Sequence, residues 1–140
     1  MYKKIMIAMA FVCCALIASG QEAPDAKLYV RYNQAYINNL LNNNPEIVVY
    51  LNFFVNNSWR IIDKPDKEID CSKLSKINPE TGEILEDPIT SEDLEDFNIY
   101  RYNYRMDPDK RTYYTLGDTD KILIVLSDNE LSKLYKNRQK

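Results

Sequence analysis

The sequence of 140 residues contains no histidine, three glycines and three cysteines. Without histidine, the chain cannot use a Ser-His or Cys-His nucleophile pair, a histidine acid or base, or a histidine-containing zinc site. Only Gly82 and Gly117 lie beyond residue 20, so no glycine-rich loop is present to hold a phosphate group. Cys71 is the only cysteine beyond residue 20, so that part of the chain cannot form an internal disulfide. No motif specifies a reaction, and we expect no cofactor and no metal site.

The first 20 residues have the three regions of a secretory signal peptide. Lys3 and Lys4 are basic, residues 5–17 form an apolar run, and the letters ASG supply small residues for cleavage. The run is shorter than the roughly 20 residues that a membrane-spanning helix needs. We therefore predict a signal peptide at 1–20 and a mature chain that starts at Gln21 with no transmembrane segment.

Cys13 and Cys14 lie inside this apolar run and leave a lipid anchor as an alternative. A lipidated cysteine normally ends the run, whereas here the letters ALIAS follow. We therefore expect the chain to be exported and released, either into the periplasm or outside the cell, rather than anchored.

The predicted mature chain has 120 residues, which suffice for one domain with a hydrophobic core. Its 16 basic and 21 acidic residues give a net charge of −5. An acidic chain is a poor match for nucleic acid or for an anionic membrane surface. We predict a single domain at 21–140 that does not bind nucleic acid.

The first half of this domain has a helical pattern. Apolar residues with helical spacing after Asp25 predict a helix to about residue 43, with Asp25 as its N-cap. In residues 46–56 the apolar positions fit both a helix and a strand, and the preceding Asn-Pro-Glu favours the helix. Residues 59–63 are expected to be extended.

Charged residues and turn formers dominate residues 64–96, which we expect at the surface. The letters NPETGE at 78–83 predict a tight turn, and Thr90 with Asp93 predicts a capped helical turn. Three strands with short connections follow and predict an antiparallel meander at 97–105, 112–116 and 121–127.

The last of these strands is apolar on both faces, so we expect it at the centre of the sheet. Ser127 and Glu130 then form a capping box at the start of a closing helix. The predicted fold class is α+β, with N-terminal helices, a small antiparallel β-meander and a closing C-terminal helix.

Three tyrosines in the stretch NIYRYNYR supply the candidate binding residues. On an extended strand Tyr100, Tyr102 and Tyr104 would stand on one face, next to Arg101 and Arg105. Such a row fits the half-buried layer between helices and a sheet. It also fits an exposed platform that stacks on sugar rings or binds a protein, because Tyr and Arg are enriched at interfaces. The sequence leaves both interpretations open.

Eight carboxylates between residues 80 and 96 raise the possibility of a hydrolase. Two carboxyl groups can hydrolyse a glycosidic bond without histidine, provided that one has a raised pKa. A polar, solvated stretch does not favour such a shift. The residues concerned are Glu80, Glu83, Glu86, Asp87, Glu92, Asp93, Glu95 and Asp96.

The MYKK start, NNPEIVVYLNFFVNNSW and YYTLGDTDKILIVLSDNELSKLY together resemble small, uncharacterised exported proteins of Bacteroidetes bacteria. The resemblance implies an envelope or secreted setting and supplies no catalytic residues. We predict a non-catalytic, exported binding or interaction module of the bacterial envelope, with a protein or a glycan as its partner. The alternatives are a carboxylate-dependent hydrolase acting on envelope polysaccharide and an oligomeric structural component. The partner's identity and the oligomeric state stay open.

Overall fold

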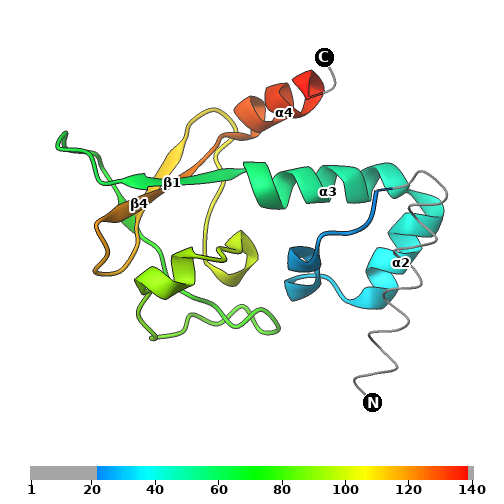
Figure 1. Ribbon diagram of the computed structural model, residues 1–140, viewed down its shortest axis with the longest axis horizontal. Helices are drawn as coiled ribbons and strands as arrows, with labels where there is room; N and C mark the ends of the chain where they lie inside the picture. Colours follow the sequence, from blue (N-terminus) through cyan, green and yellow to red (C-terminus); the bar gives the residue numbers. More distant parts are fainter. Residues whose placement is uncertain (1–21, 139–140) are drawn as a thin grey trace. The chain divides into compact units, whose positions relative to one another are not determined.

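The computed structural model describes residues 22–138, so the predicted signal peptide at 1–20 lies outside the described residues. The chain divides into two compact units, one up to Asn52 and one from Phe53 onwards. The boundary falls within helix α3 (Pro45–Asn57), which is drawn in Figure 1. Within 22–138, no helix has the length and apolar character that crossing a membrane requires.

The first unit contains two helical segments where the sequence pattern predicts one. They are the 3-10 helix η1 (Ala26–Val30) and the helix α2 (Gln34–Asn43). Asp25 caps η1 as predicted, but a single helix over 25–43 is wrong. The break occurs because the side-chain oxygen of Asn33 accepts the N–H of Tyr36 at 2.8 Å and starts a new helix.

Residues 46–56 lie in helix α3, so of the two alternatives that the sequence leaves open, the helix is correct. A buried polar residue, Asn52, explains part of its pattern. The Asn52 side-chain oxygen accepts the N–H of Asp25 at 2.8 Å, and its amide donates to the carbonyl of Ala23 at 2.8 Å. Both hydrogen-bonding groups of the side chain are thereby satisfied inside the first unit.

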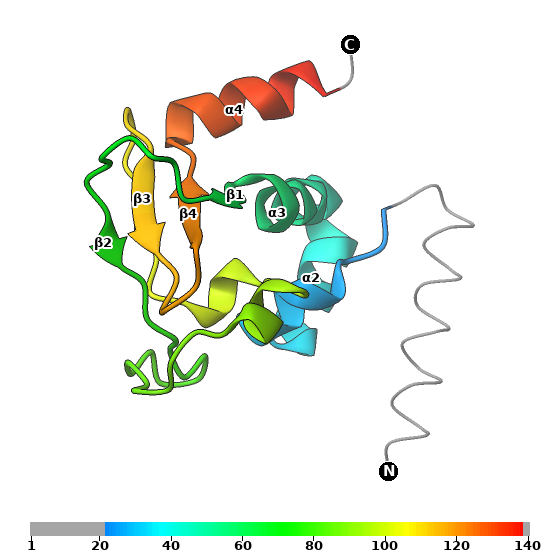
Figure 2. The ribbon, with the colours of Figure 1, turned by 60° about the vertical axis from the view of Figure 1, so that its left-hand side comes forward.

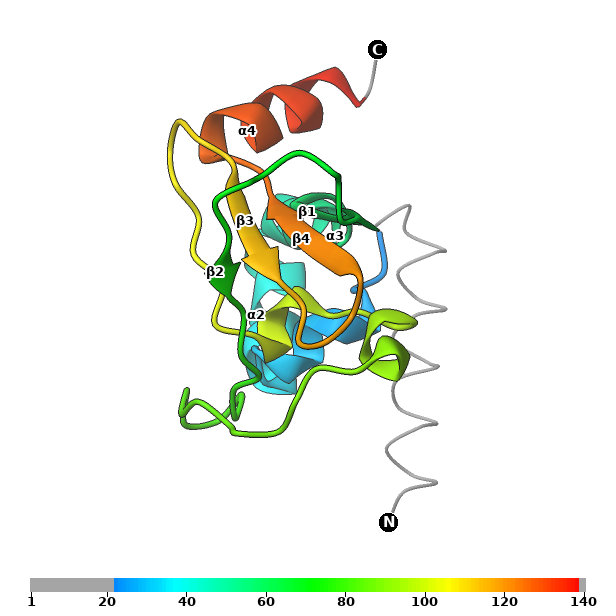
Figure 3. The same cartoon turned by 90° about the vertical axis from the view of Figure 1, so that its left-hand side faces the viewer.

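A four-stranded sheet forms the second unit, with the strand order β1-β4-β3-β2 (Figure 2). Its strands are β1 (Trp59–Asp63), β2 (Ser72–Lys73), β3 (Thr112–Thr115) and β4 (Lys121–Val125). Strand β4 pairs antiparallel with β1 and β3, whereas β2 pairs parallel with β3. The sheet is therefore mixed. The predicted antiparallel meander is correct for β3 and β4 only, because its first stretch, 97–105, is not a strand. The chain after β1 crosses to the opposite edge of the sheet before it forms β2 (Figure 3).

The stretch 97–105 is not a strand, and that prediction is wrong. It contains the 3-10 helix η3 (Ile99–Arg101), which follows a similar short helix, η2 (Ser91–Leu94). The side-chain oxygen of Asn98 accepts the N–H of Tyr100 at 3.1 Å and caps η3. This local hydrogen bond competes with strand pairing, which is reduced here to one isolated bridge between Lys76 and Tyr102.

Strand β4 lies in the centre of the sheet as predicted, and residues 122–126 are all buried. The closing helix α4 (Asp128–Asn137) follows β4 directly (Figure 2). Ser127 caps α4 by accepting the N–H of Glu130 at 3.1 Å. The Glu130 carboxylate does not complete the predicted capping box, because it accepts two hydrogen bonds of 2.9 Å from Nε of Arg111. The α+β fold class with a closing helix is confirmed.

We expect Ile124→Asp to unfold the second unit. Ile124 is 7% exposed in the central strand, and a buried unpaired charge is among the most destabilising changes, costing about 4 kcal/mol or more. The measurement is the urea midpoint of unfolding. As a control, Ile84→Asp places the same charge at a side chain that is 63% exposed and should change stability by about 0.5 kcal/mol at most. Equal midpoints for the two variants would contradict the central position of β4.

Candidate functional site

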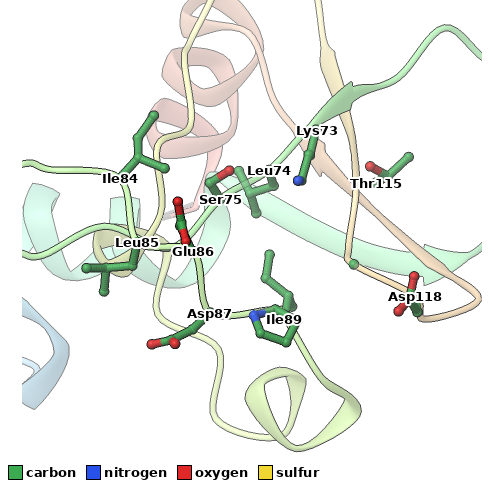
Figure 4. Close-up of a pocket in the computed structure, with 12 residues that line it drawn as sticks. Lys73, Leu74, Ser75, Ile84, Leu85, Glu86, Asp87, Ile89, Thr115 and Asp118 are labelled. Atoms are coloured by element: carbon green, nitrogen blue, oxygen red, sulfur yellow. The ribbon is translucent and has the colours of Figure 1, made fainter.

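Two neighbouring clefts lie on the surface of the second unit. The larger, cleft A, has a volume of about 650 Å³ and lies between the ends of β2 and β3 and the loop 84–89. Figure 4 shows Ile84, Leu85 and Glu86 at one end of it and Asp118 at the other, with Lys73 and Ile89 facing each other across the middle. The charged residues that line cleft A are one cation, Lys73, and three carboxylates, Glu86, Asp87 and Asp118.

The smaller cleft B, of about 390 Å³, shares Leu85 with cleft A. It lies between the segment 76–77 and the short helices η2 and η3. Its charged lining residues are two cations and three carboxylates: Lys76, Arg101, Glu92, Asp93 and Asp96. Counted together, the charged residues that line the two clefts are three basic and six acidic, so this face is acidic.

Ile84 and Leu85, which we call the apolar ridge, are adjacent in the chain; Leu85 lines both clefts and Ile84 lines cleft A. They are 63% and 38% exposed, and Ile84 is the most exposed large hydrophobic side chain among the described residues. The tight turn predicted at 78–83 holds the ridge in place, since the N–H of Asn78 donates to the carbonyl of Glu83 at 2.8 Å. The N–H of Leu85 then donates to the carbonyl of Lys76 at 2.8 Å. The ridge is therefore hydrogen-bonded to the segment 76–77, which follows β2, although its side chains are open to solvent.

Gly117 shapes the floor of cleft A. Its φ of +56° is one that residues with a side chain rarely adopt. A Cβ at this position would lie 2.3 Å from the carbonyl oxygen of Ile89. The absence of a side chain therefore allows the loop before η2 to approach the β3–β4 turn closely.

A network of hydrogen bonds around the half-buried Asp93 organises cleft B. The Asp93 carboxylate accepts the N–H of Thr90 at 2.7 Å, as the predicted cap requires, and forms an ion pair of 2.9 Å with Lys76. Burial acts to raise the pKa of Asp93, but the hydrogen bonds from Thr90 and Lys76 outweigh it and hold the pKa below its ordinary value. Burial, together with the Asp93 charge, raises the pKa of the neighbouring Tyr102 to about 12, although Arg101 acts in the opposite direction.

The predicted row of tyrosines does not form one exposed face. Tyr100 and Tyr102 are 5% and 4% exposed, and Tyr104 is half-buried. The Tyr100 ring stacks on Phe54 with centroids 5.9 Å apart, and the Tyr102 ring stacks on Phe97 at 4.8 Å. Of the two open interpretations, the structure favours packing for these two rings.

The structure separates the two arginines that flank the row. Arg101 and Tyr102 line cleft B, whereas Arg105 is exposed outside both clefts. The Arg105 N–H donates to the hydroxyl of Tyr114 at 2.8 Å. Binding of a partner by Arg101 or Tyr102 stays a prediction, and it now concerns cleft B rather than a row of rings.

The apolar ridge is what the sequence interpretation missed. Its signal was present, because Ile84 and Leu85 are adjacent aliphatic residues inside a stretch expected at the surface. The surrounding carboxylates are exposed, as that expectation implies, except for the half-buried Asp93. Cys71 is half-buried with a free thiol beside a third hollow of about 600 Å³. In the part of the chain that the structure covers, no three His, Cys, Asp or Glu side chains gather as a metal site would need.

No protein-family model matches this chain, and no curated protein or solved structure matches it either. Its function therefore has to be inferred from its own residues.

We expect Gly117→Ala to cost more stability than Gly82→Ala. Both glycines have a positive φ, so each alanine adds strain of about 1–2 kcal/mol. Gly82 has open space around it, whereas at Gly117 the new methyl group collides with the Ile89 backbone and displaces the loop. Urea denaturation of both variants checks this. Equal losses of unfolding free energy in the two variants would show that Gly117 is required for its positive φ and not for the close approach of Ile89.

Tyr102 should ionise near pH 12 instead of its ordinary 10.0. Its folded-state pKa lies above the unfolded value, so its contribution to stability is present below pH 10 and is lost as the pH rises from about 10 to 12. The tyrosinate absorbance that disappears in Tyr102→Phe reports this titration. Asp93→Asn removes the neighbouring negative charge and should lower the midpoint. A midpoint that does not move would contradict the proximity of the two side chains.

Proposed function

We propose that this chain is a non-catalytic binding module of the bacterial envelope, and that it binds a protein through the apolar ridge and clefts A and B. The observation that carries the proposal is the exposure of Ile84, a large aliphatic side chain that lines cleft A next to Leu85, which lines both clefts. An exposed apolar ridge with a polar, charged surround is typical of a protein-binding site. The export of the chain is part of the proposal and depends on the signal-like residues 1–20.

A protein partner is favoured over a glycan. Sugar rings stack on exposed aromatic faces, but cleft A has no aromatic lining residue and the tyrosine in cleft B is buried. The excess of carboxylates around both clefts favours a partner segment that places an apolar side chain beside the ridge and cationic side chains next to it.

The electrostatics favour binding over hydrolysis. A glycoside hydrolase needs a general acid whose pKa is raised. Shifts are resolved for three described carboxyl groups, and all three are lowered: Asp93, Asp107 and Glu130. The cause in each case is a set of hydrogen bonds to the charged form, which suits a structural carboxylate.

A photo-crosslinking amino acid at Leu85, introduced in the cells that produce the protein, tests the proposal. We expect a discrete protease-sensitive adduct that is absent when the same group is placed at Lys133, an exposed residue of α4. Adding Ile84→Ser should abolish the adduct, and with the isolated partner it should weaken binding by about tenfold or more. The urea midpoint of Ile84→Ser should stay unchanged, because the side chain is exposed.

Two results would contradict the proposal. If the adduct resists protease and releases sugar on hydrolysis, the partner is a glycan and not a protein. Adducts that are the same at Leu85 and Lys133 would show that the ridge does not select a partner.

A further inference from the structure

Strand β1 forms one edge of the sheet, and its hydrogen bonds to β4 determine which of its backbone groups point outward. The N–H of Leu126 donates to the carbonyl of Ser58 at 2.9 Å, and the N–H of Lys64 donates to the carbonyl of Asp120 at 2.8 Å. In an antiparallel pair, hydrogen-bonded residues alternate with residues whose N–H and C=O point away.

Ser58 and Lys64 are both hydrogen-bonded to the neighbouring strand, and such residues recur at every second position. Between them, the residues of β1 that form hydrogen bonds to β4 are therefore Arg60 and Ile62. The N–H and C=O groups of Trp59, Ile61 and Asp63 therefore point away from the sheet. No backbone hydrogen bond to these outward groups occurs between residues 22 and 138.

Within β1 itself, the features that protect exposed strands from pairing are limited to the charged side chains of Arg60 and Asp63, and Lys64 and Pro65 come only after the strand. It contains no proline or glycine, and its register with β4 continues without a bulge. The carboxylate of Asp63 is engaged by Lys121 of the neighbouring strand. Ile62 is 38% exposed, so the edge offers an apolar side chain beside its open backbone groups.

We propose that β1 pairs antiparallel with β1 of a second copy of this chain, with Ile61 facing Ile61 across a twofold axis. The three outward residues are symmetric about Ile61, so this axis places Trp59 of each copy opposite Asp63 of the other. Every outward N–H and C=O then gains a partner, and the two four-stranded sheets become one continuous sheet.

The side chains fit the same register. It places Arg60 opposite Ile62 of the second copy, where the stem of the arginine covers the exposed isoleucine. Shifting the pairing by two residues places Arg60 opposite either Arg60 or Lys64 of the second copy, and like charges directly opposite each other are destabilising. A shift by one residue matches outward with inward groups and forms no ladder. The self-complementarity of this one register is why a second copy fits the edge better than an unrelated strand does.

A matched pair of charge variants at Ile62 tests the register, using the chain expressed from its complete sequence. Ile62→Glu places a carboxylate opposite Arg60 of the second copy, and Ile62→Lys places a cation there. Sedimentation equilibrium over a wide concentration range should show a weak dimer for the natural chain. The dissociation constant should be lower for Ile62→Glu than for Ile62→Lys, by about tenfold, because the twofold axis duplicates the pair.

Amide hydrogen exchange in the natural chain provides a second measurement that needs no substitution. Protection of the Ile61 and Asp63 amides should increase with protein concentration, whereas the Ile62 amide, which faces β4, should be protected at every concentration. A monomer at all concentrations overturns the proposal. Equal effects of Glu and Lys at residue 62 also overturn it, because they would mean that a dimer uses another register or another surface. None of these results bears on the clefts, whose binding is tested separately.

Discussion

The need to cover both faces of β4 is the constraint on which the second unit depends. A strand of alternating aliphatic residues on both faces cannot lie at an edge without exposing apolar surface to water. Strands β1 and β3 pair with it on its two sides, and residues 122–126 are all buried. Trp59 packs against Phe97 at 4.7 Å between centroids, and Phe97 stacks in turn on Tyr102. Tyr102, in this group, and Tyr100, which stacks on Phe54, are therefore buried, whereas Tyr104 is half-buried.

Most of the charged stretch 64–96 is at the surface, although it also supplies β2 and buries Leu74 and Ile89. Its turn and its cap are local structures, built by Asn78 and by Thr90 with Asp93. Between them in the chain lie Ile84 and Leu85, which are exposed at cleft A, and Leu85 also lines cleft B. Rigid presentation of apolar side chains lowers the entropic cost of binding, which is why this face, and not the tyrosine row, supports the proposed interaction.

The two proposed interfaces lie on different features of the same sheet. Cleft A borders the end of β2, and the proposed self-pairing uses β1, which forms the opposite edge. A dimer through β1 would therefore leave both clefts open and double the number of ridges in one particle. Two linked sites bind a repetitive or paired partner more tightly than one site does, without any new contact.

The local structures and the central strand follow from the sequence of neighbouring residues alone. Caps at Asp25, Thr90 and Ser127, the turn at 78–83 and the aliphatic strand β4 depend on neighbouring residues or on a strong pattern, and each was predicted. The stretch 97–105 was mispredicted because the period-two pattern and the Asn98 cap indicate opposite structures, and only the surrounding packing chooses between them. The parallel pairing of β2, the burial of Tyr100 and Tyr102 and the exposure of Ile84 likewise depend on contacts between distant segments. Local hydrogen bonds and periodic patterns depend on residues that are adjacent in the sequence. Which side chains become buried depends instead on how the sheet, the short helices and the loops pack against one another.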